Sequence, residues 1–207
     1  VKYAQNEGSY LAGVLAAIAA TDKATFPLSS GEPKIAVVAG MDLPVIQDFI
    51  VGFKQGAATV VPDIEVQVIF IGSFNDAQKA YDLTKAAIEN GANVVYNVAG
   101  PAGLGILKGA ADAGKYAIGV DSDQNGLHPD NVIASMLKQI GNSIYDSIGQ
   151  IRAGKAEFGK LKIYGLANEG VGLVYNDKLV PDAVKAKVAE AKAKVVKGEL
   201  KVDTAFK

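Results

Sequence analysis

Two carboxylates and one lysine stand where they could bind a small molecule. Asp121 and Asp123 follow an apolar run, residues 117–120, that is typical of a buried strand, and Lys138 follows a second such run, 132–136. In parallel α/β sheets, ligands sit beyond the carboxyl ends of the strands. An acid at one strand end and a lysine one strand later could therefore grasp a hydroxylated small molecule. Asp residues after a strand are also common turn formers and helix caps, so this structural role stays open.

Catalysis is a weaker interpretation of the same residues. Asp121 and Asp123 could act as general acid and base in a small α/β hydrolase or transferase, but we expect their side chains to point apart in the turn. The chain has no cysteine and one histidine, His128, which argues against a zinc site. That histidine has no G-x-S-x-G nucleophile motif to serve. We therefore predict a binding protein without catalytic residues, metal or cofactor.

A glycine-rich turn, residues 100–105, lies between a predicted strand and a predicted helix. Its spacing is G-x-x-G-x-G, which differs from the dinucleotide-binding G-x-G-x-x-G, and Pro101 removes one amide donor. The pattern favours a turn that lets a ligand approach closely over a cradle for phosphate.

Length and composition set the class of protein. The chain has 207 residues, of which 49% are hydrophobic, and its formal net charge is −1. This suits one large α/β domain with a sizeable core, and scattered basic residues do not predict a nucleic-acid surface. The apolar stretch 10–20 is too short to span a bilayer and lacks the flanks of a signal peptide. Because the chain opens on Val1, we expect a processed or truncated product.

Strands and helices alternate along most of the chain. Strands are predicted at 35–39, 64–71, 93–98, 116–120, 132–136 and 160–166, and helices at 7–20, 44–60, 76–90, 102–113, 138–153 and 181–197. The apolar runs of the first four strands start near residues 35, 64, 93 and 117, so they recur every 24 to 29 residues, which is the length of a βα unit. This period predicts a parallel sheet with helices on both faces. The alternating pattern of 64–71 places that strand nearer a sheet edge, and 168–175 is either a loop or a strand.

Several blocks of sequence, in order, resemble one known family. They are NEGSYLAG (6–13), AGMDLPVIQDFIVGF (39–53), GSFND (72–76), NVAGPAGLG (97–105), IGVDSDQ (118–124), ASMLK (134–138) and EGVGL (169–173). Together they resemble the basic membrane protein family of substrate-binding lipoproteins, whose best-known members bind purine nucleosides for ABC transporters. The chain is more distantly similar to sugar-binding proteins and repressor effector domains of the type I periplasmic fold.

The resemblance implies roles for individual residues. Asp121 matches the acid that grips the ribose hydroxyls, and Lys138 matches the lysine that assists it. The turn at Gly100, with Val98 and Ala99, matches the strand end that lies against the purine. Two further candidate ligand-binding residues, Met41 and Asp42, lie at the end of the first strand. The aromatic that stacks on the base is left open between Tyr96 and Phe74, and a core role for either is equally compatible.

The resemblance also implies a domain organisation and a location. Family members have two lobes, and the resemblance implies that this sequence lacks most of the amino-terminal lobe. We therefore expect residues 1–136 to form the carboxyl-terminal lobe, and residues 137–207 to be crossover and closing segments that pack on the missing lobe. We expect self-association through the surface that it leaves, and weak nucleoside binding.

The expected function is solute capture for an ABC importer in the cell envelope, with a permease as partner. Its ligand would be a purine nucleoside. A ligand-sensing or autoinducer-type member of the same fold is the alternative, because fold does not settle the ligand.

Overall fold

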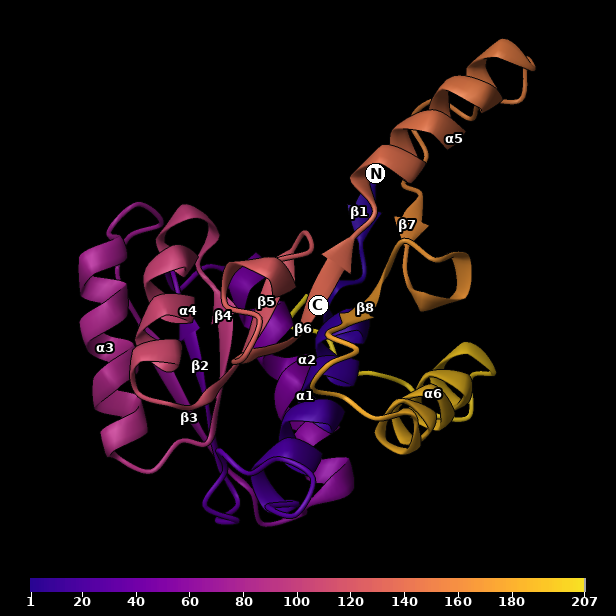
Figure 1. The fold of residues 1–207 in the computed structure, drawn as a ribbon. Helices are drawn as coiled ribbons and strands as arrows, with labels where there is room; N and C mark the ends of the chain where they lie inside the picture. Colours follow the sequence, from indigo (N-terminus) through magenta and orange to yellow (C-terminus); the bar gives the residue numbers. More distant parts are fainter. Residues whose placement is uncertain (207) are drawn as a thin grey trace.

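The computed structural model describes residues 1–206, and its ribbon is drawn in Figure 1. The helices are α1 (Gln5–Thr21), α2 (Pro44–Val60), α3 (Ala77–Glu89), α4 (Gly103–Asp112), α5 (Ile140–Arg152) and α6 (Asp182–Val196). The strands are β1 (Lys2–Tyr3), β2 (Lys34–Ala39), β3 (Glu65–Phe70), β4 (Val94–Val98), β5 (Tyr116–Asp121), β6 (Val132–Lys138), β7 (Ile163–Tyr164) and β8 (Val171–Tyr175). Short 3₁₀ turns are η1 (Gly100–Ala102), η2 (Asn125–Leu127) and η3 (Leu166–Asn168).

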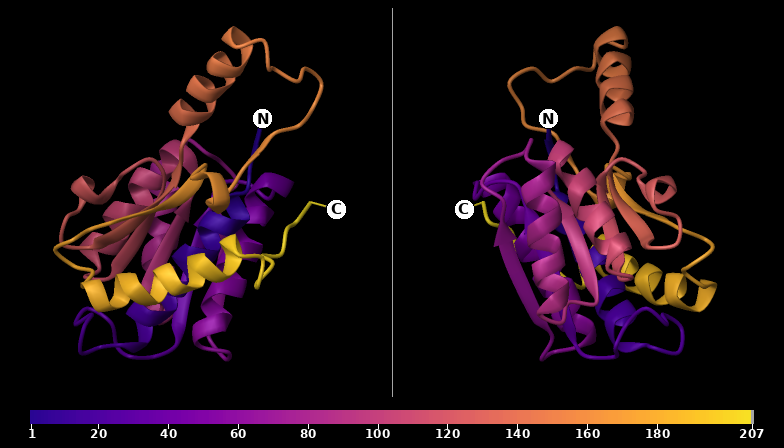
Figure 2. Two further views of the ribbon diagram at one scale, coloured as in Figure 1. Left: turned by 90° about the vertical axis from the view of Figure 1, so that its right-hand side faces the viewer. Right: turned by 60° about the vertical axis from the view of Figure 1, so that its left-hand side comes forward.

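Six strands form one sheet in the order β3-β2-β4-β5-β6-β8. Strands β2 to β6 pair in parallel, and β8 runs antiparallel to β6. One face of the sheet packs on α1 and α2, and the other on α3 and α4 (Figures 1 and 2). The predicted α/β fold with helices on both faces is confirmed, and β3 lies at the predicted edge.

Helix α1 is the centre of the larger core. Its residues from Gly8 to Ala20 are all buried, as expected for a helix that is apolar around its whole circumference. It packs closely on α2 because each helix places glycine against the backbone of the other. A Cβ atom at Gly13 would lie 2.0 Å from the Phe53 carbonyl oxygen, and one at Gly56 would lie 2.0 Å from the Tyr10 carbonyl oxygen.

Helix α5 projects from the body of the molecule as an arm, together with the segment 153–162 that returns to β7 (Figure 2). Two predictions were wrong here. The strand predicted at 160–166 is only β7, which pairs with β1 outside the main sheet. Lys138 ends β6 instead of beginning a helix, because it continues the ladder with β8.

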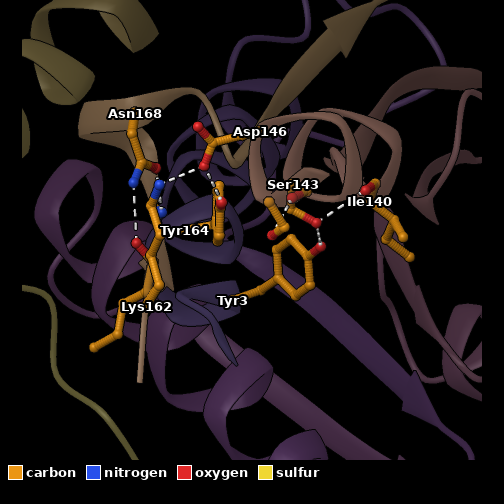
Figure 3. Close-up of polar contacts among 10 residues, drawn as sticks. Tyr3, Ile140, Ser143, Asp146, Lys162, Tyr164 and Asn168 are labelled. Atoms are coloured by element: carbon orange, nitrogen blue, oxygen red, sulfur yellow. Dashed lines mark hydrogen bonds and ion pairs between the residues drawn. The ribbon is translucent and has the colours of Figure 1, made fainter. Parts of the chain in front are cut away.

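Three segments that are distant in sequence meet at the base of the arm (Figure 3). The Tyr3 hydroxyl hydrogen-bonds with the Ser143 hydroxyl, which donates to the Ile140 carbonyl oxygen at 2.9 Å. Asp146 pairs with Lys162 and accepts a hydrogen bond of 2.5 Å from the Tyr164 hydroxyl. The first turns of α5 are thereby tied to the β1–β7 pair.

The carboxyl-terminal part of the chain packs on the main body. Val184, Val188 and Ala191 of α6 are buried in the core that contains α1. Beyond α6, the Gln55 amide donates to the Lys201 carbonyl oxygen at 3.1 Å, and its oxygen accepts from the Asp203 amide at 2.7 Å. Apolar side chains of β8, α6 and the tail therefore pack against α1 within this chain, and the expected packing of residues 137–207 on a second lobe stays a prediction. No helix within residues 1–206 has both the length and the apolar character needed to cross a membrane.

Candidate functional site

The candidate site lies at the carboxyl ends of the parallel strands. Because these strands run in the same direction, their carboxyl ends share one edge of the sheet. The chain leaves β3 through Gly72 and β4 through Gly100, with φ angles of +82° and +54°. It leaves β5 through Asp121, which also has a positive φ, +66°. Glycine adopts such angles freely, whereas an aspartate does so at a cost in free energy.

Asp121 is the centre of a three-residue turn. The Ser122 amide donates to the Val120 carbonyl oxygen at 2.8 Å, which closes a γ-turn whose positive central φ marks its rarer form. A non-glycine residue held in such a conformation costs on the order of 1–3 kcal/mol, and such residues cluster at functional sites.

Asp121 and Lys138 form an ion pair, with 3.4 Å between the carboxylate oxygen and the ammonium nitrogen. The register of β5 and β6 brings them together, since Asp121 stands opposite Leu137. The lysine side chain is 17% exposed and its ammonium lies 4.7 Å from the centre of the Phe49 ring, whereas the aspartate side chain is 48% exposed. The lysine is thus held in place, and its carboxylate partner faces solvent.

The end of β4 is shaped by glycine and an aromatic ring. Gly100 is exposed, whereas the side chains of Val98 and Ala99 are buried. Of these three predicted residues, only Gly100 is accessible to a ligand. The Phe74 ring lies against Gly40, where a Cβ atom would come within 2.3 Å of it, and 3.8 Å from the Cβ position of Gly100. Phe74 therefore belongs to the strand-end surface.

The two residues predicted at the end of β2 are exposed. Met41 has 41% of its surface accessible, and Asp42 accepts a hydrogen bond of 2.6 Å from the Gln47 side chain. They lie at the same sheet edge as Asp121, two strands away from it.

Tyr96, one of the two aromatics considered for base stacking, is a core residue. It is fully buried, stacks on Phe53 with ring centres 4.9 Å apart, and hydrogen-bonds with the Ser9 hydroxyl at 3.0 Å. Burial raises the pKa of its hydroxyl far above the usual range. The core role is the correct one, and Phe74 is the remaining candidate.

Asp123 has a local structural task. One of its carboxylate oxygens accepts a hydrogen bond of 3.0 Å from the Asn125 amide, as in an Asx-turn. Because Asp123 stabilises this turn, its carboxylate has a structural role that does not favour a catalytic pair with Asp121. Within residues 1–206, no cluster of three or more His, Asp or Glu residues is arranged to hold a metal ion.

A partly buried polar network at the strand ends was not predicted from the sequence. The side-chain oxygen of Gln124 accepts from the Val120 amide at 2.9 Å and from the Asn97 side chain at 3.2 Å. The Ser135 hydroxyl accepts from the Gln124 amide at 3.0 Å and donates to the Asn125 side chain at 2.9 Å. The only sequence signal was a polar residue inside an apolar strand, as Asn97 and Ser135 are.

A separate open groove of about 620 Å³ lies between β8 and α6. It contains none of the predicted site residues, and Lys185 on its wall is paired with Asp177 and Asp182. The charge of Lys185 is thus balanced within the chain, and we place the candidate site at the strand ends.

Comparison with known proteins identifies relatives of the whole chain. The chain is 33% identical over 217 residues to the ABC transporter nucleoside-binding protein BmpA of Lactococcus lactis, covering 97% of this chain and 58% of that protein. It is 30% identical over 197 residues to basic membrane protein A of Borreliella afzelii, covering 94% of this chain and 58% of that protein. The chain thus spans somewhat more than half the length of these curated relatives.

Solved structures share the fold. A solute-binding protein of an ABC transporter system from Aeropyrum pernix has a TM-score of 0.83 at 24% identity, covering 99% of this chain and 66% of that one. A transcriptional activator of the comK gene from Bacillus halodurans has a TM-score of 0.83 at 23% identity, with coverages of 96% and 65%. The model of the family described as ABC transporter substrate-binding protein PnrA-like matches residues 1–204. The chain therefore belongs to this family of PnrA-like substrate-binding proteins.

Proposed function

We propose that this chain is the ligand-binding lobe of a protein that captures purine nucleosides for an ABC importer in the cell envelope. Capture involves no chemical conversion, and the permease of the importer is the partner. The family supports solute binding, and the nucleoside-binding relative from Lactococcus lactis supports the ligand class. The observation that carries the proposal is the half-exposed Asp121 carboxylate, held at a strand end by a strained turn and paired with Lys138.

The chemistry of this pair suits the ribose of a nucleoside. A carboxylate has two oxygens and only accepts hydrogen bonds, so it can receive both vicinal hydroxyl groups of a ribose. Lys138 is a donor beside it and can supply a hydrogen bond to the ribose oxygens. Hydrogen bonds to a charged acceptor contribute roughly 1.5–3 kcal/mol each.

The end of β4 offers a place for the base. Gly100 has no side chain and is exposed, so a flat ring can approach the backbone there. The neighbouring Phe74 ring provides an apolar surface at the same point. Because these groups cover one side of a ligand, we expect the chain to bind nucleoside with a dissociation constant above about 1 μM.

We further propose that the arm is the packing surface for a second lobe. Four apolar side chains along α5 are at least half exposed, Ile140, Ile144, Ile148 and Ile151, and the curated relatives are longer than this chain. Exposed apolar patches of this kind usually mark an interaction surface. In isolation, we expect the arm to drive self-association, which the double substitution Ile144→Lys with Ile148→Lys should reduce in sedimentation experiments. A monomer at high concentration without these substitutions would contradict this.

The ligand assignment can be tested with one isosteric substitution. Asp121→Asn keeps the shape of the side chain and removes its charge, so guanosine binding should weaken about ten- to a hundredfold, at 1.4 kcal/mol per decade. Binding of 2′,3′-dideoxyguanosine, which lacks both hydroxyls, should change little.

Asp123→Asn is the matched control, because an asparagine oxygen can still accept the hydrogen bond of the Asn125 amide. It should affect guanosine binding much less. If Asp123 is the more sensitive position, or if the two ligands lose affinity equally in Asp121→Asn, the assignment of the ribose-binding acid is wrong.

A further inference from the structure

The side chain of Gln124 substitutes for a neighbouring strand at the end of β5. Pairing between β4 and β5 ends at Tyr96 and Ile118, two residues before Val120. Beyond that point the Val120 amide donates to the Gln124 side-chain oxygen at 2.9 Å, and the same oxygen accepts from Asn97 of β4 at 3.2 Å. One oxygen atom thus connects the ends of two strands that no longer pair.

Gln124 is fixed from both of its ends. Its backbone amide donates to the Ser135 hydroxyl of β6 at 3.0 Å, so the glutamine is held by three adjacent strands. The Gln124 side chain is also tightly packed against Gly119. A Cβ atom at Gly119 would come within 2.7 Å of both the Gln124 side-chain oxygen and the Ser135 hydroxyl oxygen.

The Asn97 side chain is likewise tightly packed against a glycine, Gly103. A Cβ atom at Gly103, in the first turn of α4, would lie 2.2 Å from its side-chain nitrogen. The Asn97 oxygen accepts from the Ala99 amide at 3.1 Å, so this side chain also organises the exit of β4 toward Gly100. The network therefore reaches both strand ends of the candidate site.

The contact of Gln124 bears directly on the strained turn. The Val120 amide that Gln124 holds belongs to the peptide group between Gly119 and Val120. The next peptide group begins with the Val120 carbonyl, which accepts from the Ser122 amide, and this group directly precedes the Cα atom of Asp121. A backbone with a positive φ relaxes to a more favourable conformation unless its flanking groups are fixed. Gln124 holds the peptide group just before the one that flanks Asp121, so it restrains Val120, the residue from which the turn begins.

We propose that Gln124 is a positioning residue for the ligand site, which holds the Asp121 carboxylate in its binding orientation through the Val120 amide. The effect on ligand binding rests on the proposed function, whereas the effect on the backbone does not.

Two substitutions separate hydrogen bonding from shape. Gln124→Met keeps the length of the side chain and removes the acceptor, and Gln124→Glu keeps an acceptor oxygen for both donors. Gln78→Met is the control for composition, because Gln78 is an exposed residue of α3 whose side chain bonds only Asp82 among the contacts of the described chain. All three variants are compared with the unchanged chain after thermal melts show that they fold.

The first readout needs no ligand. Amide hydrogen exchange at Val120 and Ser122 should be at least about tenfold faster in Gln124→Met, which corresponds to 1.4 kcal/mol per decade. Gln124→Glu should restore most of this protection, and Gln78→Met should not alter it. Unchanged exchange at both amides in Gln124→Met would overturn the positioning role, whatever the chain binds.

The second readout is a double-mutant cycle for guanosine binding. Gln124→Met should weaken binding about tenfold in the unchanged background, and much less when Asp121→Asn is already present, because the glutamine acts through that carboxylate. Equal losses in both backgrounds would overturn the proposal. If the unchanged chain binds no nucleoside, the proposed function fails and the exchange experiment still decides the role of Gln124.

Discussion

Replacing Asp121 by glycine should separate the stability of the fold from its ligand site. The aspartate occupies a φ of +66°, in which a residue with a Cβ atom costs roughly 1–2 kcal/mol more than in a right-handed conformation. Glycine removes this strain but is more flexible in the unfolded chain, which opposes folding by about 0.5–1 kcal/mol. Loss of the partly exposed ion pair with Lys138 costs about 0–1 kcal/mol. These effects nearly cancel, so the free energy of unfolding should stay within about 1 kcal/mol of its original value.

Comparison of glycine with alanine isolates the backbone strain. Asp121→Gly and Asp121→Ala both lack the carboxylate and differ only in the Cβ atom. The glycine variant should therefore be more stable than the alanine variant by about 1 kcal/mol. Both should lose guanosine affinity about ten- to a hundredfold, because neither can accept the ribose hydroxyls.

Urea unfolding followed by far-ultraviolet circular dichroism measures these differences in stability. The comparison requires that the slope of the free energy of unfolding against urea concentration is the same in each variant. The same pair of substitutions at Asp42 is the matched control. Asp42 follows β2, two strands away from β5, and it is exposed and has no positive φ. There, alanine should be at least as stable as glycine. If Asp121→Ala equals or exceeds Asp121→Gly in stability, the turn is not strained and the argument from its conformation fails.

Two further predictions concern the packing and the arm. Gly56→Ala should destabilise the fold by about 1–3 kcal/mol in urea unfolding, because its Cβ atom would meet the Tyr10 carbonyl, whereas Gly149→Ala, with open space around it, should stabilise by up to about 1 kcal/mol. Equal effects at the two glycines would refute the close contact. Hydrogen bonding to Lys162, and then to Tyr164, lowers the pKa of Asp146 to about 2, below its unfolded value near 3.9. Its stabilisation of α5 should therefore be complete above about pH 4 and lost as the pH falls toward 2. Amide exchange in α5 should show this loss, and Asp146→Asn should remove it; the same acid response in both proteins would refute it.

Much of the fold was predictable because glycine and proline mark the ends of its elements. Pro44 begins α2 at its first residue, and Gly91 and Gly114 follow α3 and α4 with the positive φ that ends a helix. The pairing of Asp121 with Lys138 was also predictable, since β6 follows β5 in the chain and lies beside it. These features depend on residues close in sequence or on the regular succession of βα units.

Other features depend on contacts that no local pattern reveals. Residues 160–166 have the composition of a strand, yet only β7 forms, because its partner is the two-residue β1 at the far end of the chain. The sequence of the lysine-rich helix α6 does not show that its narrow apolar stripe packs in the α1 core, because α1 lies at the other end of the chain. The contact between Gln124 and Asn97 exists only once β4 and β5 lie side by side.

The arrangement at the strand ends gives a physical reason for placing an aspartate where glycine would fit with less strain. The exits from β3 and β4 use Gly72 and Gly100 for the same sign of φ, so the fold itself does not require a side chain at position 121. The strain is retained because the network around Gln124 holds the turn before any ligand arrives. A carboxylate that is already fixed loses less conformational entropy when a ligand binds. It therefore binds more tightly those hydroxyl groups that are placed to donate to it in this orientation. Relaxation of the turn should therefore weaken binding of the ribose more than binding of the base, which is the difference that guanosine and its dideoxy analogue measure.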